Sequence, residues 1–259
     1  MKKVLVTGAN GQLGQCIQKI AEEYDSVDFV FKDSKELNII NADKVDSIFK
    51  DINFDFCINC AAYTNVEQAE KTPEIAFKVN AEGVRNLALA CKDYNVVLIH
   101  ISTDYVFDGE KEGPYTVEDI PNPINEYGKS KLRGEKYIQE ILGNYLIIRT
   151  SWLYSELERN FYSTILKKAK AGEELRITDD QTGCPTNALH LARFIIEQLS
   201  IARPNSGILH FTDGKAMTWY GFAKLILEEN NLACKVQLVK DDNYRTFANR
   251  PRNSVLYTL

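Results

Sequence analysis

A glycine-rich segment directly behind a short apolar run constrains this chain more than any other feature. Residues 4–6 read Val-Leu-Val, and residues 7–14 read Thr-Gly-Ala-Asn-Gly-Gln-Leu-Gly. In a strand, turn and helix of this kind, Gly8 permits the tight turn, Gly11 lets backbone approach a pyrophosphate, and Gly14 lets the helix pack closely. The helix N-terminus then faces the anion. Surface turns also use glycine, but the preceding strand and the apolar spacing of the following helix favour a dinucleotide site.

Apolar runs alternate with helical patterns through the first 150 residues, which is typical of a parallel sheet wrapped by helices. We predict strands at residues 3–7, 28–32, 54–59, 96–102 and 145–150, and helices at residues 12–24, 42–51, 73–94 and 126–142. Thr72 is a candidate N-cap and Pro73 suits the first turn of the third helix. Residues 108–125 are rich in glycine and proline and are expected to form a loop over the carboxyl edge of the sheet, where such sheets bind ligands.

The pattern loosens after residue 150 into shorter elements. We predict helices at residues 161–171, 188–199 and 219–230, with strands at residues 175–177 and 208–211. The expected fold class is α/β: a Rossmann-type doubly wound parallel sheet with a small C-terminal substrate lobe. The expected domains are an NAD(P)-binding domain at residues 1–150 and a smaller substrate-binding lobe at residues 151–259, partly interleaved with the sheet. A cleft between them would be the default substrate site.

Charge and cysteine usage narrow the class of protein. The net charge of −5 and the lack of a long basic cluster argue against nucleic-acid binding. No apolar run reaches the length of a membrane span. Six scattered cysteines are typical of a reducing cytoplasm, and the Cys-x-x-Cys at residues 57–60 lies in a strand-like run without partner ligands. His100, His190 and His210 have apolar neighbours, so we expect satisfied core or edge histidines.

The pair Tyr127 and Lys131 is the candidate for acid-base chemistry. The two residues are four apart near the start of a predicted helix and therefore share one face. A phenol has a pKa of about 10, and an ammonium ~4 Å away can favour phenolate by roughly 4 kcal/mol, or about three pKa units. Such a tyrosine donates a proton to a developing alkoxide near neutral pH.

The spacing of this pair is not unique, because Tyr220 and Lys224 repeat it in a predicted amphipathic helix. Context separates the two pairs. Tyr127 follows the long loop at the binding edge of the sheet, and the preceding strand ends at Thr103, whose hydroxyl would meet a substrate carbonyl there. Thr103, Tyr127 and Lys131 are therefore the predicted catalytic residues.

Together with the glycine segment, this trio resembles the extended short-chain dehydrogenases/reductases that act on nucleotide sugars. Further segments are similar to one branch, the dTDP-4-dehydrorhamnose reductases, and they span nearly the whole chain. These segments are residues 59–67, 102–109, 127–135, 149–154, 160–161, 180–186 and 250–254. The resemblance implies reduction of the C4 ketone of dTDP-4-dehydro-L-rhamnose by NADPH or NADH, giving dTDP-L-rhamnose for surface polysaccharide.

The resemblance also implies roles for individual residues. Tyr127 would donate the proton, Lys131 would lower the tyrosine pKa and hold the nicotinamide ribose, and Thr103 would hydrogen-bond the reacting oxygen. The implied cofactor contacts are Gly8, Asn10, Gly11, Gln12, Leu13, Gly14, Asp33, Asn38, Ile39, Ala61, Ala62 and Tyr63, besides Tyr127 and Lys131. The implied substrate contacts are Thr64, Val66, Thr103, Asp104, Tyr105, Trp152, Asn160 and Arg250.

Some positions depart from that family. Members that bind magnesium between subunits carry acidic residues where this chain has Cys16 and Leu189, so we predict no metal there. Asn38 stands where the family often has Asp. Asp33 favours a free ribose hydroxyl while Lys32 and Lys35 would accept a 2′-phosphate, which leaves NADH and NADPH both open.

Alternative functions remain open at this point. A sugar-nucleotide dehydratase normally has a carboxylate pair after the threonine, whereas Asp104 is followed by Tyr105 here. A reductase of another 4-keto-6-deoxy nucleotide sugar fits the same residues. The chain also ends sooner after residue 256 than family members usually do, which keeps a non-catalytic subunit in view. The expected partners are a nucleotide sugar and no nucleic acid or membrane, for a cytoplasmic monomer or homodimer.

Overall fold

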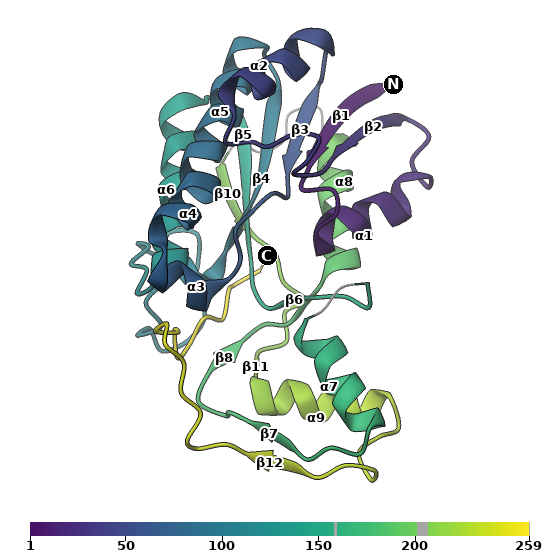
Figure 1. Ribbon diagram of the computed structural model, residues 1–259, viewed down its shortest axis with the longest axis vertical. Helices are drawn as coiled ribbons and strands as arrows, with labels where there is room; N and C mark the ends of the chain where they lie inside the picture. Colours follow the sequence, from purple (N-terminus) through teal and green to yellow (C-terminus); the bar gives the residue numbers. More distant parts are fainter. Residues whose placement is uncertain (158–159, 201–206, 259) are drawn as a thin grey trace.

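The computed structural model describes residues 1–157, 160–200 and 207–258. Its central layer is a six-stranded sheet of order β10-β5-β4-β3-β1-β2, in which every pairing is parallel (Figure 1). These strands are β1 Lys2–Thr7, β2 Val27–Lys32, β3 Phe56–Asn59, β4 Val97–Thr103, β5 Tyr145–Thr150 and β10 Gly207–His210. The predicted Rossmann-type α/β fold is confirmed.

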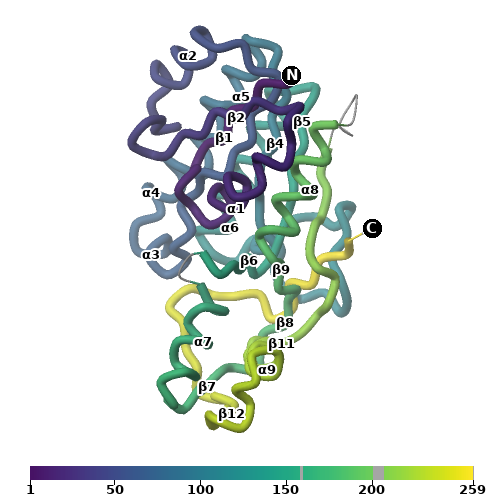
Figure 2. Tube along the Cα trace, turned by 90° about the vertical axis from the view of Figure 1, so that its right-hand side faces the viewer, coloured from purple at the N-terminus to yellow at the C-terminus, as the bar shows by residue number. Residues whose placement is uncertain are grey.

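Helices cover both faces of the sheet. Helices α1 Gln12–Ala21 and α8 Ala188–Ser200 lie side by side on one face, as Figure 2 shows. Helices α2 Ala42–Asp51, α5 Val84–Asp93 and α6 Glu126–Ile141 cover the other face. Side chains alternate along a strand, so Val4 and Val6 join the first apolar cluster while Leu5 joins the second.

The helix predicted at residues 73–94 is present as one continuous helical run, residues 73–93, with a π-helical segment inside it that we did not predict. An unpredicted helix, α3 Val66–Lys71, is followed by α4 Pro73–Phe77 and a π-helical turn, η1 Lys78–Gly83. The predicted capping role of Thr72 is wrong, since its hydroxyl donates to the carbonyl of Gln68 and so ends α3. Gly134 of α6 packs against the π turn, where a Cβ would lie 2.2 Å from the Asn80 carbonyl. The turn therefore supports α6, which carries Tyr127 and Lys131.

A smaller group of elements lies beyond the carboxyl edge of the sheet, at the bottom of Figure 1. Helices α7 Phe161–Lys170 and α9 Trp219–Glu229 pack together over a separate apolar cluster. The short strands are β6 Leu153–Tyr154, β7 Leu175–Ile177, β8 Thr182–Gly183, β9 Thr186–Asn187, β11 Met217–Thr218 and β12 Leu238–Lys240. The chain passes between the two parts more than once, because α8 and β10 belong to the sheet although they follow α7.

The C-terminal segment returns to the edge of the sheet after β12. Leu256 bridges to Tyr115 in the loop over that edge, and Asn253 bridges to Thr182 at β8. The 3-10 turn η2 Asp104–Val106 directly follows β4 and lies beneath this segment. Residues 108–125 otherwise form no helix or strand, as the sequence predicts.

Within the described ranges, no helix is long and apolar enough to cross a membrane. All six cysteines are free thiols, and Cys57 of the Cys-x-x-Cys is fully buried in β3. The three histidines have polar partners, as expected: His100 faces Asn59, exposed His190 pairs with Asp213, and His210 faces the Tyr115 carbonyl.

Candidate active site

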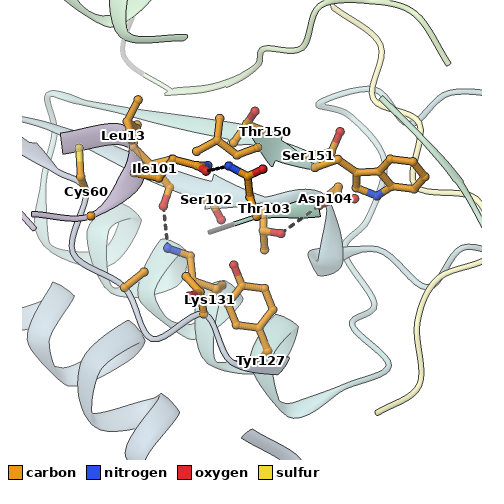
Figure 3. A pocket seen from close by; sticks show the side chains of 17 residues that line it. Leu13, Cys60, Ile101, Ser102, Thr103, Asp104, Tyr127, Lys131, Thr150 and Ser151 are labelled. Carbon is orange, nitrogen blue, oxygen red and sulfur yellow. Dashed lines mark hydrogen bonds between the residues drawn. The ribbon is translucent and has the colours of Figure 1, made fainter. Parts of the chain in front are cut away.

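A pocket of about 470 Å³ opens at the carboxyl ends of the strands and brings the predicted trio together. In Figure 3 the Tyr127 side chain extends from α6 toward Thr103 at the end of β4, and the Lys131 side chain extends toward Ile101 of the same strand. Predicted residues that also line it are Gly11, Gln12, Leu13, Ala62, Thr64, Asp104, Trp152 and Asn160. Sequence reasoning missed Cys60, Ile101, Ser102, Thr150, Ser151 and Leu153. These lie in the last residues of β4 and β5 or just after β3 and β5, so the rule that ligands lie at strand ends would have found most of them.

The glycine turn has the geometry that a pyrophosphate needs. Gly8 has φ +67°, and a Cβ there would lie 2.6 Å from the Ala61 nitrogen. A Cβ on Gly14 would lie 2.5 Å from the Gly8 carbonyl, so α1 begins in close contact with the turn. Gly11 caps α1 without any side-chain hydrogen bond, which leaves the positive end of the helix directed at the pocket. The turn therefore fits a dinucleotide phosphate.

Asp33 lies at the end of β2, beside this turn. Its carboxylate accepts hydrogen bonds from the backbone of Lys35 and Glu36 and from the Asn10 amide at 2.7 Å. Hydrogen bonds from the Glu36 and Lys35 backbone, with the nearby lysine charges, hold the Asp33 pKa below its ordinary value. The carboxylate is thus ionised and oriented by Asn10, as an acceptor for a ribose hydroxyl needs to be.

Other predicted cofactor residues lie around the pocket and not in its wall. The Ile39 side chain is buried in the core against Gly83, and Asn38 accepts a hydrogen bond from Ile40 within its own turn. The backbone of Tyr63 is clamped on both sides by the Asn80 amide, at 2.8 and 2.9 Å. The adenine-side contacts of residues 38 and 39, and those of Ala61 and Tyr63, stay predictions.

The Tyr127 hydroxyl is in a different electrostatic setting from the one the sequence suggests. Burial raises the pKa of Tyr127 above its ordinary value; the Thr103 side chain opposes this, while Asp104 and Tyr105 add to it. Lys131 is not among the groups that shift this pKa, and its Nζ donates to the Ile101 carbonyl at 2.6 Å (Figure 3). The lowering of the Tyr127 pKa by Lys131 stays a prediction.

Lys131 is almost fully buried, with 2% of its surface exposed. Burial lowers the pKa of Lys131 to about 8, against the opposing effects of Glu135 and Cys60. Its Nζ also lies 3.4 Å from Nε2 of His100. The charge of this lysine is consequently sensitive to small changes around it near neutral pH.

Asp104 follows Thr103 and is also buried. One carboxylate oxygen accepts the Thr103 hydroxyl at 3.0 Å, and the other has no hydrogen-bond partner within the described residues. Burial raises the pKa of Asp104 to about 7, although the nearby Ser254 side chain and the hydrogen bond from Thr103 oppose the change. The second carboxylate oxygen is buried as well as unpartnered among the described residues.

Replacing Asp104 by Asn is expected to stabilise the protein more at pH 8 than at pH 5. A carboxyl whose pKa rises on folding destabilises the native state as pH increases from its ordinary value toward the folded value near 7. The gain at pH 8 should be about 2 to 4 kcal/mol, and the amide oxygen still accepts from Thr103. Urea unfolding at both pH values measures the difference. An equal effect at both would show that ionisation of Asp104 carries no such cost.

Trp152 forms one wall of the pocket in an unusual backbone conformation. It has φ +46°, and its ring stacks on Trp219 with 3.6 Å between centroids and 7° between planes. A Cβ on Gly183 would lie 2.5 Å from the Trp152 ring, so this glycine makes room for the indole. Trp219 and Gly183 are functional neighbours that sequence reasoning missed, because they come from β8 and the start of α9.

Two predicted substrate residues have clear structural roles. Asn160 caps α7 by accepting from the Ser163 backbone, and its amide donates to Gln12 beside the glycine turn at 2.7 Å. Val66 begins α3 and does not line the pocket, whereas Thr64 does. A substrate contact of Val66 stays a prediction.

Arg250 lines a second pocket of about 300 Å³ next to the first. Its guanidinium donates to Glu67 at 2.9 Å and to the Tyr105 hydroxyl at 3.4 Å, while its buried Nε has no partner among the described residues. The other walls are Phe161, Arg176, Ile177, Thr178, Gln181, Trp219 and Tyr244. Trp219, stacked on Trp152, lies between the two pockets.

A buried ion pair supports the end of β4. Glu135 of α6 accepts from Arg149 of β5 at 2.6 and 3.0 Å, and it also accepts the Ser102 hydroxyl. Each side chain of the pair is at most 2% exposed. This pair fixes α6 to β4 and β5 directly beneath the trio.

Cys16 and Leu189 lie together in a smaller pocket of about 220 Å³. Neither side chain offers the hard oxygen ligands that magnesium prefers. No group of three metal-ligating side chains occurs in the part of the chain that the structure describes. The absence of a metal stays a prediction for this protein.

Comparison with known proteins gives full-length similarity. The profile of the family described as RmlD substrate binding domain matches residues 1–259. The dTDP-4-dehydrorhamnose reductase of Aggregatibacter actinomycetemcomitans is 39% identical, with 99% of this chain and 90% of that protein covered. The Escherichia coli enzyme of the same name is 36% identical over 98% of this chain and 89% of its own length. The Bacillus anthracis dTDP-4-dehydrorhamnose reductase structure in complex with NADP is 37% identical, with a TM-score of 0.93 and coverage of 100% and 92%.

Proposed function

The chain belongs to the dTDP-4-dehydrorhamnose reductase family, and we propose that it reduces the C4 ketone of dTDP-4-dehydro-L-rhamnose to dTDP-L-rhamnose with NADPH or NADH. One observation carries the proposal: a single pocket holds Thr103, Tyr127 and Lys131 beside the uncapped start of α1. When bound, the reduced nicotinamide supplies the hydride. The product would enter surface polysaccharide.

We propose that Tyr127 gives its proton to the developing alkoxide. Tyr127 and Thr103 line the same pocket, so the Thr103 hydroxyl, which donates to Asp104 without a ligand bound, would turn to the same oxygen. Asp104 and Trp152, which line the same pocket, would orient the sugar. Lys131, Gly11, Gln12 and Leu13 would hold the cofactor, with Asp33 at its adenosine ribose.

The second pocket supports binding of the nucleotide part of the substrate. Its aromatic side chains suit a base, and the Arg250 guanidinium, with its unpartnered Nε, suits a diphosphate. Trp152 and Trp219 would then separate sugar from nucleotide. Reduction of another 4-keto-6-deoxy nucleotide sugar is the alternative that these contacts support equally.

Simple reduction is favoured over dehydration by the residue after Asp104. Tyr105 is buried and its pKa is raised to about 12, chiefly by burial. It cannot act as the second carboxylate of a dehydratase. A non-catalytic subunit is disfavoured because all three residues of the trio line one pocket.

The direct test mixes purified protein with NADPH or NADH and a panel of 4-keto nucleotide sugars, and follows loss of nicotinamide absorbance. We expect turnover that is fastest with the dTDP-linked 4-keto-6-deoxy sugar. Lack of turnover with every sugar and both cofactors would refute a reductase and leave the non-catalytic alternative. Faster turnover with a different base or epimer would replace the named substrate.

We further propose that the protein works in the cytoplasm as a monomer or a homodimer. The free state of all six thiols, including Cys234 at the surface, supports a reducing compartment. The reductase site needs no residue from a second copy in this proposal.

A further inference from the structure

A row of buried polar side chains crosses three strands of the sheet and ends at Lys131. Thr7 of β1 is in register with Asn59 of β3, and Asn59 is in register with His100 of β4. The three residues are at most 1% exposed. Residues in register on neighbouring parallel strands point to the same face, and here that face carries α6 and Lys131. Polar groups buried this deeply are held by the hydrogen bonds among them.

The direction of the hydrogen bonds along this row is fixed at Asn59. The Ala61 backbone N–H lies 3.1 Å from one amide atom of Asn59, and a backbone N–H can only donate. That atom is therefore the amide oxygen, which also accepts the Thr7 hydroxyl at 2.7 Å. The amide nitrogen must then face His100, and it donates to Nδ1 at 3.0 Å.

The tautomer of His100 follows from this direction. Burial and the Lys131 charge lower the pKa of His100 far below its ordinary value, so the ring is neutral and carries one proton. Nδ1 accepts from Asn59, and the proton therefore resides on Nε2. The Nε2–H group is the one that faces Nζ of Lys131 at 3.4 Å.

A donor aimed at Nζ distinguishes the two forms of Lys131. An ammonium has donors only, so its hydrogens would oppose the Nε2–H of His100. A neutral amine has a lone pair that accepts this N–H while still donating to the Ile101 carbonyl. The other groups acting on Lys131 are Glu135 and Cys60, and both favour the ammonium. Glu135 is the larger of these two opposing effects, and its oxygens already accept from Arg149 and Ser102.

We propose that His100, held as the Nε2–H tautomer by Asn59, is a positioning residue that favours the neutral amine of Lys131 and so sets the pH at which this lysine becomes charged. This inference rests on the proposed function only in treating Lys131 as part of the reductase site. The role of His100 is indirect, since it lies behind Lys131 and does not line the pocket.

The first experiment observes the tautomer directly in the unliganded protein. Two-bond 1H–15N spectra of the uniformly 15N-labelled chain distinguish protonated from unprotonated ring nitrogens. Only three histidines are present, and His100→Gln assigns the signals. We expect Nε2 protonated and Nδ1 unprotonated from pH 6 to 9. An Nδ1–H tautomer, or an imidazolium at pH 7, would overturn the proposal whether or not the protein reduces a ketone.

The second experiment uses Asn59→Asp to reverse the direction of the hydrogen bond between residue 59 and His100. The carboxylate still accepts from Ala61 and Thr7, but its other oxygen now accepts from Nδ1 and leaves Nε2 as an acceptor for the Lys131 ammonium. The titration midpoint of Lys131, read from its 13Cε signal and assigned with Lys131→Arg, should rise by about one unit, a tenfold gain in proton affinity. The pH profile of kcat/KM should move in the same direction.

The double variant Asn59→Asp with His100→Phe is the matched control. It keeps the added charge and removes the imidazole, so the rise should largely disappear. A rise that persists in the double variant would attribute the effect to charge alone and refute the role of His100. No rise in Asn59→Asp would refute it too. If Asn59→Asp does not fold, the tautomer of His100 in the wild-type protein still tests the proposal. Absent ketone reduction alongside the expected tautomer would count against the proposed function alone.

Discussion

Replacing Tyr127 by Phe is expected to lower kcat by a factor of about 10² to 10⁴, the usual contribution of a positioned proton donor. The change removes one oxygen and keeps the ring, which packs edge-on against Tyr105 with 5.9 Å between centroids. Folding should therefore change little. The measurement is steady-state oxidation of NADPH with the preferred 4-keto nucleotide sugar, together with cofactor binding followed by fluorescence.

The chain contains a matched control for this substitution. Tyr220 stands four residues before Lys224 with the same spacing, but it lies in α9 next to Lys240 and outside the pocket. Tyr220→Phe should keep nearly full activity. Equal activity of Tyr127→Phe and wild type would remove Tyr127 from the mechanism. Equal losses in both variants would mean that the loss reflects general damage and not proton donation.

Replacing Arg149 by Met should cost about 3 to 5 kcal/mol of unfolding free energy, the largest stability effect that we expect from one substitution. The change preserves much of the side-chain volume but leaves Glu135 buried without its partner, against Ser102. The penalty comes from an uncompensated buried charge and not from a cavity. Urea denaturation at pH 7, with midpoint and slope compared to wild type, measures it.

The double variant Arg149→Met with Glu135→Leu distinguishes the cost of an unpaired buried charge from the loss of the ion pair or its packing. With both charges gone, stability should return to within about 2 kcal/mol of wild type, because buried ion pairs contribute little net energy. A double variant no more stable than Arg149→Met would mean that the ion pair itself, or its packing, supplies the stability. An Arg149→Met protein as stable as wild type would show that Glu135 finds another way to be satisfied.

The elements of this fold could be predicted because their signals are local. Strand and helix positions follow from apolar spacing, and the turn at Gly8 follows from a backbone that only glycine adopts easily. The π turn before α5 could not be predicted in this way. It accommodates contacts with Ile39 and α6, which come from distant parts of the chain. Thr72 likewise looks like an N-cap until α3, just before it, is known.

The candidate site likewise has features that the sequence predicts and features that depend on tertiary packing. Thr103, Tyr127 and Lys131 were identified from short motifs, and they do line one pocket. Burial shifts the pKa of both Lys131 and Tyr127, and His100 lies 3.4 Å from Nζ of Lys131; spacing along one helix reveals neither feature. Trp219 and Gly183 were missed since they reach Trp152 only through tertiary packing. Short motifs thus identify the candidate catalytic residues, whereas tertiary contacts determine their pKa values and the other walls of the pocket.

The route of the chain between its two parts limits how the pocket can open. The chain leaves the sheet after β5, returns as α8 and β10, leaves again toward α9, and comes back beside Tyr115 through Leu256. A single flexible joint therefore cannot serve as a hinge for the small lobe. Any closing motion has to bend several connections together, and the hydrogen bond from Asn160 to Gln12 is a side-chain contact that joins the two parts beside the pocket.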